Sequence, residues 1–198
     1  NDSIRGSDYG VKYKIFIPVY NDSARNIETM GQLFDADNNL LLNFTTRTHG
    51  QSNPPTSVWP NYNNSVGLNE FTSNGNTPTG FAFIDLESPE PANEEKYYGP
   101  YPIHRVIKGI AYENVTNNMA LLLQPDSTNI RSGILMHTGE WPGWSDGDQM
   151  PNSDGCIHVY PDVLNEINTI LTTKLGVVVN PNPYSSQNYA YKPQGIIS

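Results

Sequence analysis

The chain has 198 residues, enough for one domain with a substantial hydrophobic core, whereas two domains would each be small. Its formal net charge is −9, and it lacks the clustered Lys and Arg that phosphate contacts require, so we expect it to bind no nucleic acid. No apolar run reaches the length of a membrane span. Charged residues are sparse and turn-forming residues are plentiful, which predicts a mainly β fold with one or two helices.

The first half of the chain reads as strands separated by polar loops. Residues 1–10 are polar, and we expect them to form an N-terminal arm. Alternating apolar residues predict a strand from Val11 to Val19. The runs 30–34 and 40–46 flank a turn-rich segment and predict a β-hairpin. Residues 50–76 are loop-like, and a proline–glycine turn at 77–80 then precedes a predicted strand over 81–84.

The second half contains short apolar runs and one helix. The runs 103–110, 119–123 and 134–136 predict buried strands. Apolar residues at helical spacing predict a helix from Asp162 to Leu175, with Lys174 in its last turn and Gly176 at its C-terminal cap. We expect a short strand over 177–179 and a polar C-terminal tail over 180–198.

The stretch from Gly133 to Val159 holds the only cysteine and two of the four histidines. A thiol attacks carbonyl groups as the thiolate, and a nearby histidine is the usual base that generates it. His137 and Cys156 fit that requirement if they lie on two neighbouring strands. The residue types alone leave a buried structural thiol and an intermolecular disulfide as alternatives.

Three segments resemble the L,D-transpeptidase catalytic domain family, which is also called YkuD-like. In that family a histidine is followed, after about fifteen residues, by Ser or Thr, then His-Gly-Cys, an apolar residue and Arg or Asn. Here His137 ends the segment 133–137, and Ser-Asp-Gly-Cys-Ile follows at 153–157. The segment 77–81, Thr-Pro-Thr-Gly-Phe, is similar to the family's TPxGxF turn. The resemblance covers residues 30–179, which we take as the core of a single domain.

The resemblance implies a β-sandwich or mixed sheet, with the helix that follows the cysteine motif packed on it. It also implies that Cys156 is the nucleophile and His137 its base. Ser153, Asp154 and Gly155 would shape the site, and backbone amides near Gly155 and Cys156 would form the oxyanion hole. Members of the family need no metal or other cofactor for this reaction.

The chain departs from the family pattern beside the cysteine. Asp154 stands where the family has histidine, and it either pairs with an imidazolium or raises the pKa of the thiol. His158 replaces Arg or Asn and is expected to donate to substrate, with a charge that depends on pH near neutrality. Trp141 and Trp144 are candidates for a substrate-stacking wall, with core packing as the alternative. His104 is a candidate for lining the cleft.

An acidic loop supplies the oxygen atoms of residues 146, 148, 152 and 154. Their spacing is not that of a calcium-binding EF-hand loop, and we interpret the loop as solvated rather than as a metal site.

The resemblance favours cysteine-dependent acyl transfer on a peptide or peptidoglycan-like substrate. The alternative is a non-enzymatic secreted glycoprotein, a matrix or filament subunit that self-associates and keeps the fold without the activity. Either reading predicts a secreted or extracellular protein, located in the periplasm or cell wall if bacterial. Glycosylation sequons, which barely exceed chance in this composition, stand at Asn1, Asn21, Asn43, Asn63 and Asn114.

Overall fold

The computed structural model of the chain describes residues 3–19, 25, 28–51, 70, 74–107, 133–182 and 192–198. These ranges contain short 3-10 helices, two α-helices and a set of strands that form a single sheet. The strands are β1 (Tyr13–Phe16), β2 (Thr29–Asp35), β3 (Leu40–Arg47), β4 (Ala82–Glu87), β5 (Ile103–Ile107), β6 (Leu135–His137), β7 (Ile157–Val159) and β8 (Gly195–Ile197). The helices are η1 (Gly6–Tyr9), η3 (Ala92–Glu94), α1 (Glu95–Tyr98) and α4 (Pro161–Lys174).

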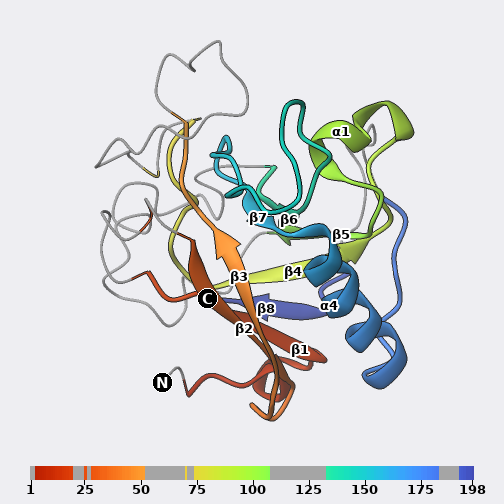
Figure 1. Cartoon of the computed structure of the whole chain (residues 1–198). Coiled ribbons are helices and arrows are strands. Elements are labelled where there is room, and N and C mark those ends of the chain that lie inside the picture. Colours follow the sequence, from red (N-terminus) through yellow and green to blue (C-terminus); the bar gives the residue numbers. More distant parts are fainter. Residues whose placement is uncertain are drawn as a thin grey trace.

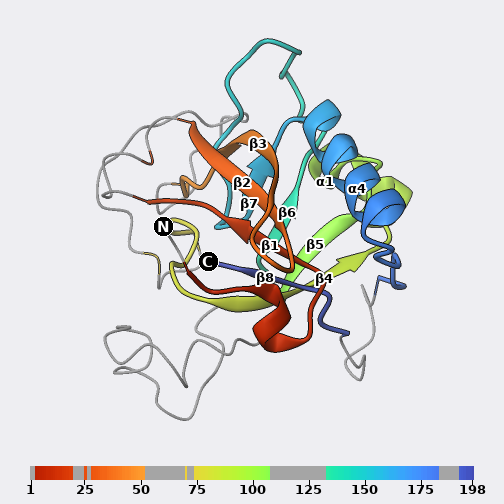
Figure 2. The same ribbon diagram turned by 90° about the horizontal axis from the view of Figure 1, so that it is seen from below.

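The sheet is a closed barrel with the strand order β1-β2-β3-β7-β6-β5-β4-β8. β8 pairs in parallel with β1, β6 pairs in parallel with β7, and the other neighbours are antiparallel. Figures 1 and 2 show the strands wrapping around the centre of the molecule, with α1 and α4 on one side. The prediction of a mainly β, mixed-sheet fold with helices is confirmed, and closure of the sheet adds to it.

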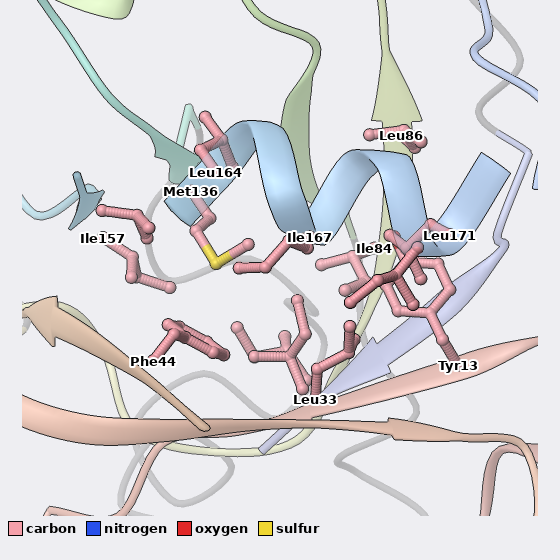
Figure 3. Close-up of a cluster of buried hydrophobic side chains, with 14 of the residues drawn as sticks. Tyr13, Leu33, Phe44, Ile84, Leu86, Met136, Ile157, Leu164, Ile167 and Leu171 are labelled. Atoms are coloured by element: carbon pink, nitrogen blue, oxygen red, sulfur yellow. The ribbon is translucent and has the colours of Figure 1, made fainter. Parts of the chain in front are cut away.

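The hydrophobic core fills the interior of the barrel and extends to one face of α4 (Figure 3). Its members alternate along the strands and recur at helical spacing on α4, as the two periodicities require. The fully or nearly fully buried members are Tyr13, Ile15, Leu33, Phe44, Ile84, Leu86, Met136, Ile157, Leu164, Ile167 and Leu171. The helix therefore packs on the sheet immediately after the cysteine segment, as the sequence predicts.

The ends of α4 follow from its sequence. Pro161 occupies the first turn, where its missing N–H costs no hydrogen bond, and Lys174 lies in the last turn near the negative end of the helix dipole. Gly176 follows with φ of 61°, a left-handed conformation that suits glycine, and its carbonyl accepts a hydrogen bond from Lys12 Nζ at 2.5 Å.

The barrel also includes strands outside residues 30–179, the range of the family resemblance. The predicted arm contains η1, whose Tyr9 packs on Phe81 and Phe83. The predicted tail contains β8, which pairs with both β1 and β4 and so closes the barrel. No strand forms over 177–179; only Asn180 makes an isolated bridge, with Glu87. The predicted strand over 119–123 lies outside the described residues.

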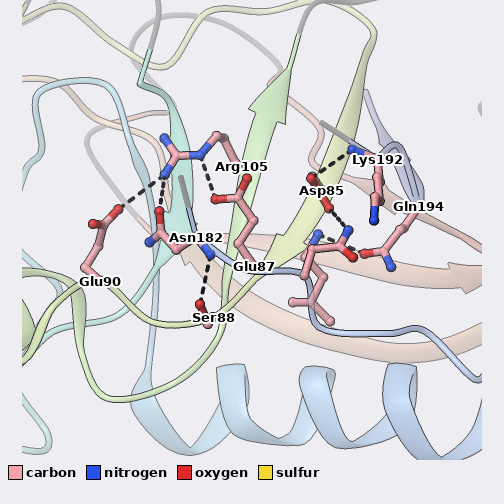
Figure 4. A network of polar contacts seen from close by, with 10 residues as sticks. Asp85, Glu87, Ser88, Glu90, Arg105, Asn182, Lys192 and Gln194 are labelled. Carbon is pink, nitrogen blue, oxygen red and sulfur yellow. Dashed lines mark hydrogen bonds and ion pairs between the residues drawn. The ribbon is translucent and has the colours of Figure 1, made fainter. Parts of the chain in front are cut away.

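A buried polar network joins β4, β5 and the segment after α4 (Figure 4). Arg105 of β5 donates to Glu87 Oε2 at 2.8 Å, to Glu90 Oε1 at 3.3 Å and to Asn182 Oδ1 at 3.2 Å. Beside it, the Asp85 carboxylate accepts from Asn180 Nδ2 and from the backbone amide of Lys192. The network lies on the outer side of β4, since Asp85 and Glu87 alternate with the core residues Ile84 and Leu86.

Candidate active site

The two histidines of the candidate site stand side by side on β6 and β7. The parallel register pairs His137 with His158, and their rings meet edge to face with centroids 4.9 Å apart. Met136 precedes His137 and Ile157 precedes His158, and both point into the core. Since side chains alternate along a strand, the two imidazoles project from the outer side of the barrel. His137 ends β6, and Cys156 precedes β7 by one residue. Alternation along β7 places Cys156 on the same outer side as His158.

The turn before Cys156 is fixed by two hydroxyl groups. Ser153 Oγ accepts from the Gly155 amide at 3.0 Å and donates to the Cys156 carbonyl at 2.7 Å. Thr77, from the TPxGxF-like turn, donates to the same carbonyl at 3.3 Å. Gly155 has φ of 109°, which a side chain would strain. These contacts join the two sequence motifs at the cysteine. The Gly155 amide already donates to Ser153 Oγ. To bind an oxyanion it must give up this hydrogen bond or share its proton between the two acceptors.

The Cys156 thiol is partly exposed, and its Sγ donates towards the Gly133 carbonyl at 3.6 Å. Gly133 has φ of 76°, the left-handed conformation, just before β6. Cys156 is therefore not fully buried, unlike the core side chains around it. Asp154, next in the motif, is exposed to solvent.

Both histidines of the pair are buried, and each ring is oriented by a backbone carbonyl. His137 Nδ1 lies 2.5 Å from the carbonyl of Thr138, and His158 Nδ1 lies 2.7 Å from that of Pro151. A carbonyl only accepts hydrogen bonds, so the proton of each neutral ring is on Nδ1 and Nε2 keeps its lone pair.

Burial lowers the pKa of both imidazoles. Loss of solvation lowers the pKa of His137 to about 4, although its hydrogen bond to Thr138 acts in the opposite direction. Loss of solvation also lowers the pKa of His158 well below its ordinary value, and the charges of His137 and Arg47 add to this effect. Both rings are therefore neutral at neutral pH, which is the state in which His137 can accept a proton.

A column of aromatic rings passes through the histidine pair. Trp144 packs on Trp141, Trp141 on His158, His158 on His137 and His137 on Tyr98 of α1, with centroids 4.6–5.2 Å apart. Trp141 is only 1% exposed, so most of its surface is covered by protein. Trp141 therefore packs the loop onto His158, which is the alternative to a substrate-stacking role for this residue. Trp144 lies half-buried at the end of the column.

Arg47 and Asn152 complete the site beneath the loop. Sequence reasoning missed Arg47 and considered Asn152 only as a calcium ligand. Arg47 pairs with His158 in the β3–β7 register and is only 1% exposed. Its Nε and Nη2 both donate to Asn152 Oδ1, at 3.0 and 2.6 Å. The available signal was an arginine at the end of an otherwise uncharged strand, where a charge is costly unless it is bound.

The loop 138–155 is held on the barrel by Glu28. One carboxylate oxygen of Glu28 accepts from the Met150 amide and from the Tyr160 hydroxyl, both at 2.7 Å.

Of the oxygens considered for calcium, Asn152 Oδ1 accepts from Arg47, and Asp148 Oδ2 accepts from the Ser145 amide. Among the residues that the structure describes, no group of three or more His, Cys, Asp and Glu is arranged to hold a metal ion.

His104 does not lie at this site. It pairs with the core residue Met136 and is fully buried, with Nδ1 3.1 Å from the Tyr13 hydroxyl and Nε2 2.8 Å from Asn168 Oδ1 of α4. Both ring nitrogens are thus engaged inside the barrel, and the expectation that His104 lines a cleft is wrong.

Comparison with known proteins identifies one family. The model of the L,D-transpeptidase catalytic domain (YkuD) matches residues 44–179, which are 136 of the 198 residues. No curated protein matches the chain. In the described part of the chain, no helix is both long and apolar enough to cross a membrane. The matched range contains Arg47, His137, Asn152, Cys156 and His158.

Proposed function

Because the chain belongs to the L,D-transpeptidase catalytic domain family, we propose that it is a cysteine acyltransferase in which Cys156 is the nucleophile and His137 the base. The observation that carries the proposal is the state of His137. Its Nδ1 is bound to the Thr138 carbonyl, burial lowers its pKa, and the half-buried Cys156 directly precedes the neighbouring strand β7. A base, a group that orients it and a nucleophile are the components that thiol catalysis requires.

The proposed reaction has two steps. His137 Nε2 takes the proton of the Cys156 thiol, and the thiolate attacks a peptide carbonyl carbon. The C–N bond then breaks, the imidazolium returns its proton to the leaving amine, and the acyl group remains on sulfur as a thioester. In the second step, an amine attacks the thioester and gives its proton to His137, which restores the thiol. With water instead of the amine, the same site acts as a carboxypeptidase.

We propose a peptide stem of the peptidoglycan type as the acyl donor, since the family acts on substrates of that class. The donor would lose its terminal D-residue, and an amine of a neighbouring stem would receive the acyl group. Such a substrate lies outside the cytoplasm, so we propose a secreted, periplasmic or cell-wall location. Glycosylation of the sequons stays a prediction; of these, Asn43 is exposed on β3.

The proposal is tested by trapping the acyl-enzyme. The wild-type protein is incubated with a carbapenem, which acylates active members of the family, or with a synthetic tetrapeptide stem, and its intact mass is measured. We expect one adduct per chain in the wild type and none in Cys156→Ala. His137→Gln should keep the thiol but lower the acylation rate by a factor of about 100 or more.

The non-enzymatic alternative makes the opposite prediction. If the wild type forms no adduct and its thiol also resists iodoacetamide at neutral pH, the acyltransferase proposal is wrong. Circular dichroism of each variant serves as the control for folding.

A further inference from the structure

We propose that His158 is a positioning residue that covers one side of His137 and shields this base of the proposed reaction from water. This inference rests on the proposed function, because it assigns His158 a role through His137. It replaces the sequence expectation that His158 donates to substrate, since the His158 side chain is buried beneath Trp141.

The first support is the fixed position of the His158 ring. Its Nδ1 is bound to the Pro151 carbonyl, its face packs on Trp141 at 4.6 Å and its other neighbour is the ring of His137 at 4.9 Å. A ring held from three sides cannot swing towards solvent without breaking the packing of the loop on β7. His158 is therefore a wall against one side of His137, and Tyr98 covers another at a centroid distance of 4.9 Å.

The second support is the charge around the pair. Among the described residues, the charged or titratable groups around it include Arg47 from β3 and Tyr98 from α1, and Cys156 directly precedes β7. Arg47 is a buried cation beside His158 in the strand register, so a second positive charge on His158 is opposed by Arg47 and by any charge on His137. When a proton enters the pair, His137 is therefore the ring that accepts it.

The consequence for the proposed reaction is a division of roles between two similar side chains. His137 accepts the thiol proton and becomes an imidazolium, while His158 stays neutral and excludes water from it. An amide at position 158 could not cover His137 in this way, because it is smaller than a ring and is itself hydrated. The imidazole at this position, where the family has Arg or Asn, would thus keep water away from the base.

The test measures the titration of His137 directly. Long-range ¹H–¹⁵N NMR spectra of the full chain give the tautomer and the titration midpoint of each histidine in the wild type, His158→Gln and His158→Phe. We expect both rings of the pair to be Nδ1-protonated in the wild type. The midpoint of His137 should rise by about one pH unit in His158→Gln, as water reaches the ring, and stay low in His158→Phe, which keeps an apolar ring.

The rate of Cys156 alkylation by iodoacetamide, measured from pH 4 to 8, gives the second readout. The thiolate is the reacting form and a protonated imidazole stabilises it, so the higher His137 midpoint of His158→Gln should raise the alkylation rate near pH 6 by up to about tenfold, whereas His158→Phe should leave the rate unchanged. His104→Gln is the matched control, since it removes a buried imidazole that does not touch the pair, and it should leave the His137 midpoint unchanged.

Three results separate the possible failures. An unchanged His137 midpoint in His158→Gln would overturn the role of His158. A wild type in which His158 takes up a proton before His137 would do the same, and that result needs no folded variant. A wild-type thiol that never reacts, together with the expected shift at His137, would instead overturn the proposed function.

Discussion

Glu87 is the group whose replacement gives the most direct test of the electrostatics described above. Its side chain is fully buried at the end of β4, with Oε2 bound to Arg105. Loss of solvation raises its pKa from 4.5 to about 7; the nearby charges of Asp85 and Glu90 add to this, and Arg105 opposes it. The folded protein therefore keeps a proton on Glu87 that the unfolded chain has already lost.

The sign and size of the effect follow from that difference. Glu87 contributes its full stabilisation below pH 4.5, and the contribution is lost as the pH rises through 7. A pKa difference of 2.5, from 4.5 to 7, corresponds to about 3 kcal/mol of unfolding free energy. Glu87→Gln cannot titrate but resembles the protonated acid. Its stability relative to the wild type should therefore improve by about 3 kcal/mol between pH 4 and pH 8.

The assay is urea unfolding at half-unit pH steps, followed by tryptophan fluorescence. Glu166→Gln, at an exposed position of α4, controls for the change in net charge. Parallel stability curves for the wild type and Glu87→Gln across pH 4–8 would refute the reasoning, since they would mean that Glu87 is ionised in the folded protein.

The same measurement checks three further predictions. Burial lowers the pKa of His104 from 6.5 to about 4, so the free energy of unfolding should fall as the pH drops through that range. In His104→Gln this fall should be smaller by about 3 kcal/mol, because glutamine does not titrate. Asn152→Leu should destabilise the fold by about 2 kcal/mol at neutral pH, because Arg47 loses an acceptor for two of its donors. Ile167→Ala should cost about 3 kcal/mol by leaving a core cavity, whereas the exposed Val178→Ala should cost less than about 0.5 kcal/mol. An Ile167→Ala cost no larger than that of Val178→Ala would contradict the packing of α4.

Local signals predicted the elements whose periodicity extends over several residues. The hairpin over 30–46 and the helix after Pro161 were found because apolar residues repeat there at strand and helix spacing. β8 was missed because Gly195–Ile197 is too short to show a period, and its place is set by pairing with strands far away in the chain. The strand predicted over 177–179 does not form. Three consecutive valines have a high β propensity, but this segment has no partner strand to pair with among the described residues.

The sequence placed the histidine–cysteine motif but not the faces on which side chains lie. His104 and Arg105 are adjacent, and alternation sends one into the barrel and the other outwards. Choosing between the two needs the strand register, which a single sequence does not reveal. For the same reason Arg47, only three residues after the core residue Phe44, could not be assigned to the site until β3 was paired with β7.

The closure of the barrel by β8 also bears on how the protein folds. β1 and β8 pair although Tyr13 and Gly195 are separated by most of the chain, so this contact is among the least local in the molecule. During synthesis, β1 and β4 each keep an unpaired edge until residues 195–197 have emerged, and exposed edges invite pairing with other chains. We therefore expect closure of this seam to be a late and aggregation-sensitive step in folding.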